Sequence, residues 1–409
     1  MNKLLIASAL LLLHFSLAGQ GASLLALTPP MGWNSWNCFR SDINEDKIRS
    51  MADAMVSSGM KEAGYQYIVI DDGWMTNLRD STGHIVVNSK KFPNGIKPVA
   101  DYVHSKGLKF GIYSSPGCYT CQKLMGSIGH EQMDANDYAA WGVDYLKYDW
   151  CNYPSKEPES LNTPIADCRA AFELMGRCLK STGRPIVYSV NDECDKGTND
   201  GALPWVKTVA NMHRTGDDIK NNWERMLYCL DLTAEIWQYA EPGYWNDPDM
   251  LEVGNETKES LWGKISQVTM NMTEYKTHFS MWCMVAAPLI AGNDLKNMTS
   301  EIRDILTNKQ LIAIDQDPLG KQGRRIRQKG DLEVWVKELV GTRFAVALLN
   351  RSSSPTDISV KWDEIGISGA KRVSDLWSNR NLGKFKKSYT GVKVKRHEAR
   401  ILLISQVEP

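Results

Sequence analysis

The strongest constraint on the fold is a repeated alternation of helix and strand patterns between about residue 28 and residue 317. Apolar, β-rich runs begin near residues 65, 108, 143 and 184, a spacing of roughly 35–43 residues, and each follows a helical pattern that ends at a glycine. Such runs, each followed by a helix, are typical of a parallel sheet. About eight units fit into this stretch, which favours a closed (β/α)8 TIM barrel over a doubly wound sheet.

One helix of this pattern has a defined start. Asp42 to Glu45 fits a capping box, and Ile48, Met51 and Met55 then recur on one helical face. The pattern therefore predicts an amphipathic helix that covers the sheet.

The sequence pattern changes after about Pro318. Short runs with partial alternation follow between turn clusters: DLEVWVKEL, RFAVALLN, DISVKW and VKVKRHEARILLIS. This pattern is typical of an antiparallel β-sandwich, and an elaboration of the barrel is the alternative. We predict a catalytic barrel over residues 24–317 and a small C-terminal antiparallel β-sandwich domain over residues 318–409.

The first residues have the features of an export signal. Lys3 precedes the apolar run Leu4 to Leu13, and small residues gather between Ala18 and Ala22. The run is too short to span a bilayer comfortably, and an uncleaved anchor is the alternative. We predict a signal peptide over residues 1–23 and a protein that is secreted, periplasmic or lysosomal, without stable membrane insertion.

Composition argues against several classes of partner and site. Lys plus Arg and Asp plus Glu both number 48, so the basic excess of a nucleic-acid binder is absent. Cys118 and Cys121 form a C-x-x-C motif that lacks a second pair at zinc spacing, which favours a structural disulfide involving one of them. The histidines show no ligand spacing, and no G-x-G-x-x-G follows a strand. We therefore predict no metal and no cofactor.

Polar side chains follow the predicted strands repeatedly. The groups are Asp71 with Asp72, Lys147 with Asp149, Arg214 with Asp217 and Asp218, and Asp247 with Asp249. In a parallel barrel these strand ends meet at the face where catalytic groups lie. Helix capping explains one such group, but four of them interleaved with Trp and Tyr indicate a sugar site. Carboxylates accept hydrogen bonds from hydroxyls, and two of them can cleave a glycosidic bond.

Seven motifs follow one another in order from Pro29 to Gly323: PPMGWNSWNCF, YIVIDDGW, LKFGIYSS, DYLKYDWC, RTGDDI, WNDPDML and DQDPLGKQG. Together they resemble the glycoside hydrolase family of α-galactosidases and α-N-acetylgalactosaminidases, the melibiase group or family 27. The resemblance implies a (β/α)8 barrel followed by a β-sandwich and a retaining mechanism. It implies Asp149 as the nucleophile and Asp218 as the acid/base, ~5–5.5 Å apart, with Asp217 as the rival acid.

The resemblance also implies a galactose pocket. Its side chains would be Trp36, Asp71, Asp72, Tyr113, Lys147, Asn191, Arg214 and Asp249. Asp71 and Asp72 would bind the 4- and 6-hydroxyls, and Cys121 and Cys151 match the family's disulfide beside the site. The loop around Asn191 departs from the family pattern at the contact to the sugar 2-position, so a turn role for Asn191 is the alternative.

These observations predict a retaining α-galactosidase that hydrolyses terminal non-reducing α-D-galactosyl residues of oligosaccharides or glycoconjugates. An α-N-acetylgalactosaminidase on the same scaffold is the nearest alternative. A catalytically silent sugar-binding protein and a metal-dependent hydrolase are alternatives from other classes. The expected partner is the α-galactosyl substrate rather than a nucleic acid, and a homodimer is the assembly to test.

Overall fold

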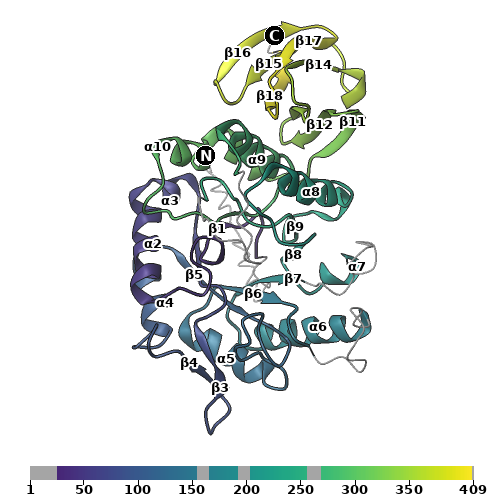
Figure 1. Ribbon diagram of the computed structural model, residues 1–409. Coiled ribbons are helices and arrows are strands. Elements are labelled where there is room, and N and C mark those ends of the chain that lie inside the picture. Colours follow the sequence, from purple (N-terminus) through teal and green to yellow (C-terminus); the bar gives the residue numbers. More distant parts are fainter. Residues whose placement is uncertain (1–24, 154–164, 192–202, 256–268, 408–409) are drawn as a thin grey trace, which may run out of the picture.

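The structure is a computed structural model that describes residues 25–153, 165–191, 203–255 and 269–407 (Figure 1). The predicted signal peptide, residues 1–23, lies outside the described residues.

Eight parallel strands form the centre of the first part of the chain, in the order β10-β1-β2-β5-β6-β7-β8-β9. A parallel bridge between Leu251 and Ala291 joins the two ends of this sheet. The strands are β1 (Met31–Asn34), β2 (Tyr67–Val69), β5 (Lys109–Ser114), β6 (Tyr145–Asp149), β7 (Val187–Asn191), β8 (Met212–Arg214), β9 (Trp245–Asp247) and β10 (Leu289–Ala291). The predicted (β/α)8 architecture is confirmed.

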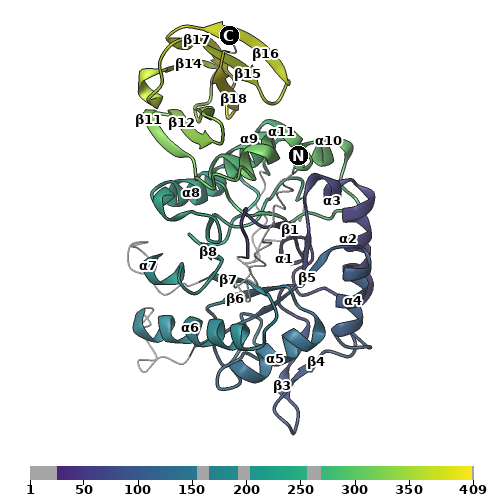
Figure 2. The same ribbon diagram turned by 180° about the vertical axis from the view of Figure 1, so that it is seen from behind.

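Helices surround these strands in both views (Figures 1 and 2). They are α1 (Trp36–Phe39), α2 (Glu45–Ser57), α3 (Met60–Ala63), α4 (Lys97–Ser105), α5 (Glu131–Trp141), α6 (Ile165–Ser181), α7 (Leu203–Val206), α8 (Trp223–Ala234), η1 (Trp237–Tyr239), α9 (Met272–Met284), α10 (Ser300–Leu306) and α11 (Lys309–Asp315). A hairpin of β3 (Met75–Arg79) and β4 (Ile85–Val87) lies between α3 and α4 in the chain.

The helix α2 tests the capping prediction. The predicted apolar face is buried, but the cap is Asn44 rather than Asp42. Asn44 has extended backbone angles, and its side chain accepts a hydrogen bond from the backbone N–H of Lys47. Three residues separate these partners, which is the spacing of an N-cap bond, so the helix begins two residues later than the capping box predicts.

The last part of the chain forms two antiparallel sheets, β11-β12-β13-β18-β15-β16 and β14-β17. The strands are β11 (Arg324–Lys329), β12 (Leu332–Leu339), β13 (Arg343–Asn350), β14 (Thr356–Lys361), β15 (Lys371–Asp375), β16 (Arg380–Phe385), β17 (Ser388–Val394) and β18 (Ala399–Gln406). Val346 of the larger sheet packs with Ile358 and Val394 of the smaller one in a separate apolar core. This packing of two sheets confirms the predicted β-sandwich.

The run Val392 to Ser405 forms the end of β17 and most of β18, with a turn at residues 395–398 between them. The predicted boundary between residues 317 and 318 falls in the connection from α11 to β11, and it stays a prediction.

The C-terminal sandwich packs against the barrel beside α8 and α9 (Figures 1 and 2). Arg351 of the sandwich binds Asp231 of α8 through two hydrogen bonds of 2.8 and 2.7 Å. Within the described ranges, no helix has the length and apolarity needed to cross a bilayer.

Candidate active site

The predicted site residues come from consecutive strands of the barrel. Each lies at the C-terminal end of a strand or in the segment that follows it: Trp36 after β1, Asp71 and Asp72 after β2, Tyr113 in β5, Lys147 and Asp149 in β6, Asn191 in β7, Arg214 in β8, Asp218 after β8 and Asp249 after β9. In a parallel barrel these ends share one face. The contacts described next show that the charged members converge there.

Asp149 ends β6 and is mostly buried. The Lys147 ammonium lies 3.8 Å from Asp149 Oδ2 and 2.8 Å from Asp71 Oδ2, and it sits over the Tyr113 ring at 5.3 Å. Burial raises the pKa of Asp149 to about 6, the positive charge of Lys147 opposes this rise, and the negative charge of Asp71 adds to it. Asp149 Oδ1 is buried and has no hydrogen-bond partner among the described residues.

The two aspartates after β2 have different surroundings. Asp71 is fully engaged: Asn34 and Lys147 donate to Oδ2 at 2.8 Å, and the Asp72 backbone N–H donates to Oδ1 at 2.8 Å. Asp72 Oδ2 accepts one bond of 2.9 Å from the Gln122 backbone, whereas its buried Oδ1 has no partner in the described chain. Burial raises the pKa of Asp72 to about 7. Asp72 is therefore the member of the pair with an acceptor left for a ligand hydroxyl.

Arg214 connects the other half of the site. Its guanidinium lies 3.2 Å from Asp218 and 3.3 Å from Asp249. Partial burial raises the pKa of Asp218, but Arg214 and then Lys147 outweigh this effect, and the net pKa lies below the usual value of 3.8. The neighbouring Asp217 is directed to Arg225, at 3.5 Å. Of the two adjacent acids, Asp218 is the one that contacts the charged centre of the site.

Asn191 lies beside Asp149 in the pairing of β6 with β7 and is buried. It lines a small cavity together with Lys147, Arg214 and Asp249. The cavity measures about 20 Å³, which is too small for a sugar ring and marks the inner end of the site. The remainder of the predicted loop to Cys194 lies outside the described residues.

Two residues without a predicted role also belong to this centre. Asn34 holds Asp71, and Asp247 lines the small cavity and has a pKa raised to about 6 by burial. Both stand at strand ends inside motifs that the sequence displays, GWNSW and WNDPD. Position at the end of a strand already placed Asp247 among the polar groups of the sequence, and the same signal could have found Asn34.

The tryptophans are divided between site and core. Trp36 begins α1, is partly buried and has the Arg40 guanidinium 5.6 Å from its ring. Trp33, Trp74 and Trp245 are fully buried, and each donates its indole N–H to a backbone carbonyl. These three indoles therefore pack the barrel.

The predicted disulfide between Cys121 and Cys151 is present, with 5.3 Å between the Cα atoms. It ties the segment after β5 to the residues that follow Asp149. Asp149 and these two sulfurs form the one group of potential metal donors found among the described residues. Both sulfurs are consumed in the disulfide, so they are not the thiolates that bind metals.

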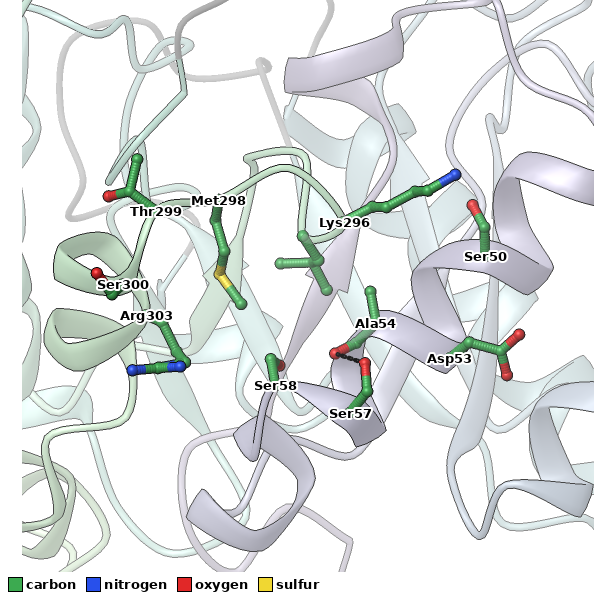
Figure 3. A pocket seen from close by; sticks show the side chains of 11 residues that line it. Ser50, Asp53, Ala54, Ser57, Ser58, Lys296, Met298, Thr299, Ser300 and Arg303 are labelled. Atoms are coloured by element: carbon green, nitrogen blue, oxygen red, sulfur yellow. Dashed lines mark hydrogen bonds between the residues drawn. The ribbon is translucent and has the colours of Figure 1, made fainter.

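A larger pocket lies outside the barrel, between α2 and the segment that leads into α10 (Figure 3). It measures about 490 Å³, and Asp53 is the one carboxylate among its lining residues. The rest of its lining is hydroxyl-bearing, apolar or basic and includes no aromatic ring. Since glycosidic cleavage needs two carboxylates, this pocket is not the catalytic site.

Comparisons with known proteins agree with this geometry. A family model described as Alpha galactosidase A matches residues 28–317, and one described as Alpha galactosidase C-terminal beta sandwich domain matches residues 329–404. An alpha-galactosidase of Cyamopsis tetragonoloba is 45% identical over 358 residues, which cover 87% of this chain and 81% of the relative.

Two solved structures share the fold over nearly the whole chain. Alpha-galactosidase I from Mortierella vinacea has a TM-score of 0.84 and 35% identity, covering 93% of this chain and 97% of the other. An α-galactosidase from Saccharomyces cerevisiae, solved with raffinose, has a TM-score of 0.80 and 28% identity, covering 93% and 98%. The chain therefore belongs to the alpha-galactosidase family of glycoside hydrolases, the melibiase group.

Proposed function

We propose that this protein is a retaining α-galactosidase that hydrolyses terminal, non-reducing α-D-galactosyl residues of oligosaccharides or glycoconjugates. One observation carries the proposal, which is that two carboxylates with different surroundings meet in one charged centre. Asp149 is mostly buried and has an oxygen without a hydrogen-bond partner, whereas Asp218 is half exposed and contacts the Arg214 guanidinium. The names of the relatives support galactose as the sugar, and the yeast relative solved with raffinose supports an oligosaccharide substrate.

In the first step Asp149 attacks the anomeric carbon as a carboxylate. Asp218 gives its proton to the glycosidic oxygen, and the bond from the anomeric carbon to that oxygen breaks. Lys147 favours the ionised nucleophile because its ammonium lies 3.8 Å from Asp149. The product of this step is a galactosyl ester of Asp149 and a free alcohol.

In the second step water replaces the ester oxygen at the anomeric carbon. Asp218 takes a proton from that water, the bond to Asp149 breaks, and galactose leaves with its original configuration. Asp218 is suited to both steps because it is about half exposed, so its carboxyl reaches both the leaving group and solvent water.

The sugar hydroxyls would be bound by the other polar residues of the site. Asp72 offers a free buried oxygen, whereas Asp71 is held by Asn34 and Lys147 and so fixes the ammonium in place. We assign Trp36 as the apolar wall, and Tyr113, Asn191, Arg214 and Asp249 as the remaining lining of the pocket.

Initial rates on p-nitrophenyl α-galactoside and p-nitrophenyl α-N-acetylgalactosaminide, measured side by side from pH 4 to 8 with EDTA present, test the proposal. We expect a strong preference for the galactoside. The opposite preference would assign the enzyme to the acetamido sugar. Loss of activity in EDTA would indicate a metal-dependent hydrolase, and release from neither substrate would favour a silent sugar-binding protein.

We also propose that the protein is exported, that residues 1–23 are removed, and that residues 24–317 and 318–409 form separate domains. Lys3 and the apolar run after it support the first two points. N-terminal sequencing of the exported protein tests the cleavage, limited proteolysis tests the boundary, and light scattering in solution tests whether the protein is a homodimer.

A further inference from the structure

The turn between β17 and β18, residues 395–398, reaches from the sandwich to the barrel. Thr277 of α9 donates its hydroxyl to the His397 carbonyl at 2.7 Å and accepts the Ala399 backbone N–H at 2.9 Å. His397 has a left-handed backbone, with φ at 55°, and is only 9% exposed. A turn that would ordinarily lie in solvent is therefore docked on the barrel.

The His397 ring contacts two barrel helices. It stacks on the Trp223 indole, with 4.2 Å between the ring centroids and 8° between the planes. Its Nδ1 lies 2.5 Å from Glu274 Oε1. Trp223 is the first residue of α8, and Glu274 lies in the first turn of α9, where its other oxygen completes the capping box with Asn271.

The starts of these helices belong to the catalytic face. In a βα barrel each helix begins where the loop from the preceding strand end arrives, and those loops carry the active site. The loop into α8 carries Asp218, five residues before Trp223. Both views place the sandwich over α8 and α9, so the C-terminal domain lies against the elements that this loop enters (Figures 1 and 2).

The start of α8 also holds the Asp218 backbone directly. The guanidinium of Arg225, two residues into the helix, donates to the Asp218 carbonyl at 2.6 Å. The backbone N–H of Ile219 donates to Asp249 at 2.8 Å. A shift of the first turn of α8 would therefore move the Asp218 carboxyl relative to Arg214 and Asp149.

We propose that His397 is a positioning residue: by fixing Trp223 it holds the start of α8, and through it Asp218, in the geometry for proton transfer. The C-terminal domain thereby completes the active site of the barrel. This inference rests on the assignment of Asp218 as the acid/base in the proposed function.

The variant His397→Asn removes the stacked ring and retains a residue that tolerates a left-handed backbone. Two substrates then separate proton transfer from folding: a galactosyl disaccharide, whose leaving sugar needs a proton, and 2,4-dinitrophenyl α-galactoside, whose leaving group does not. We expect kcat/KM to fall about tenfold for the disaccharide and by less than about twofold for the dinitrophenyl substrate, as for a displaced general acid.

Azide supplies a second readout. A displaced Asp218 also activates water poorly in the second step, so kcat of His397→Asn on the dinitrophenyl substrate should fall. Azide attacks the anomeric carbon without a base, displaces the Asp149 oxygen and forms galactosyl azide. Added azide should therefore raise kcat for the variant and not for the wild type.

Two further variants control the experiment. Trp223→Leu removes the other ring of the stack and should change the ratio of the two kcat/KM values as His397→Asn does, with no further change in the double variant. Trp377→Phe removes a different hydrogen bond between sandwich and barrel, from the Trp377 indole to Ser280 at 2.9 Å, and should leave the ratio unchanged.

The outcomes separate this inference from the proposed function. Equal losses on both substrates, or an unchanged ratio in folded His397→Asn and Trp223→Leu, would overturn the positioning role. A wild-type protein that cleaves neither galactoside would instead overturn the proposed function.

Discussion

Asp217 and Asp218 are adjacent, and both side chains are 53% exposed. They differ in their partners, because Asp218 contacts Arg214, which also binds Asp249, whereas Asp217 contacts Arg225. We therefore predict that Asp218→Asn lowers kcat/KM on a galactosyl disaccharide by ~10²–10⁴, the usual contribution of a general acid, whereas Asp217→Asn stays within about threefold. Steady-state kinetics of the two variants check this, and the reverse order would make Asp217 the acid/base.

The shifted pKa values of the proposed catalytic pair, Asp149 and Asp218, predict an acidic pH optimum. The reactive form of the pair carries one proton, with Asp149 ionised and Asp218 protonated, and the order of the two pKa values makes it the minor tautomer of the singly protonated pair. Burial raises the pKa of Asp149 to about 6, and Arg214 helps to hold that of Asp218 below 3.8. Above about pH 6 both groups are ionised, so no proton reaches the leaving group. Below the pKa of Asp218 both are protonated, so the nucleophile is neutral.

The expected kcat/KM profile on p-nitrophenyl α-galactoside is therefore a bell whose maximum lies between these two pKa values. Measurements from pH 3 to 8 check it. Activity that stays level above pH 7 would contradict the assignment of the pair.

Most of the charged residues of the site could be found from the sequence, by the rule that functional residues stand at the ends of parallel strands. It identified Asp149, Arg214 and Asp218 in order, because each stands where a parallel strand ends. The rule could not distinguish the role of Asp71 from that of Asp72, because the difference depends on which hydrogen-bond donors reach each carboxylate from other parts of the chain. Nor could it show that Trp33 and Trp245 are buried, because sequence alone does not tell an indole that packs from one that faces a ligand.

Among the elements, type was easier to predict than extent. The predicted strand Arg343 to Asn350 agrees with β13 at both ends, since its apolar residues are bounded by turns. The run Val392 to Ser405 looked continuous, and the turn at 395–398 that divides it is fixed by Thr277, which lies far away in the sequence. Local pattern predicts a strand, but a tertiary contact decides where this one breaks.

The disulfide joins two elements of the site and yields a prediction at this scale. Cys121 precedes Gln122, whose backbone N–H holds Asp72, and Cys151 follows Asp149 by two residues. Cys121→Ser should lower the free energy of unfolding by roughly 3–4 kcal/mol, the chain-entropy value for a loop of this length, and raise KM because Asp72 is less well held. Urea unfolding and steady-state kinetics check both effects.

Cys118→Ser is the matched control for this prediction. Cys118 lies in the same loop and its thiol is free, so its replacement should leave stability and KM nearly unchanged. Equal effects of the two substitutions would show that the loop depends on the residues themselves and not on the bond.

For the whole molecule, the two sequence patterns of the chain predicted a barrel and a sandwich, but they did not predict how these two domains dock. The docking surface is built from residues that stand singly in unrelated positions of the sequence. Arg325 and Arg351 of the sandwich surround Asp231 of α8 together with Glu333, which is fully buried. No spacing rule connects such residues, so this surface required the structure.

This network predicts how firmly the sandwich is held. Arg351→Gln removes two bonds to Asp231 and one to Glu333, while Arg325 still pairs with both acids. The remaining pairing should limit the loss in the free energy of unfolding to about 2–3 kcal/mol, below the ~3–5 kcal/mol for a buried charge left alone. Arg343→Gln is the control, because that exposed side chain lies 3.8 Å from Asp317 and should cost less than about 0.5 kcal/mol.

The contribution of this ion pair to stability depends on pH through the pKa of Asp231. Burial raises the pKa of Asp231, but Arg351 and Arg325 outweigh it, so the folded pKa lies below 3.8. The stabilisation by the pair is therefore complete above the unfolded pKa near 3.8 and is lost as pH falls through the lower folded value. Urea unfolding of wild type and Arg351→Gln should differ most at neutral pH, and the difference should shrink as pH falls below 3.8 toward the folded pKa of Asp231. A difference that is constant across this range would mean that Arg351 stabilises the interface by packing and not by its charge.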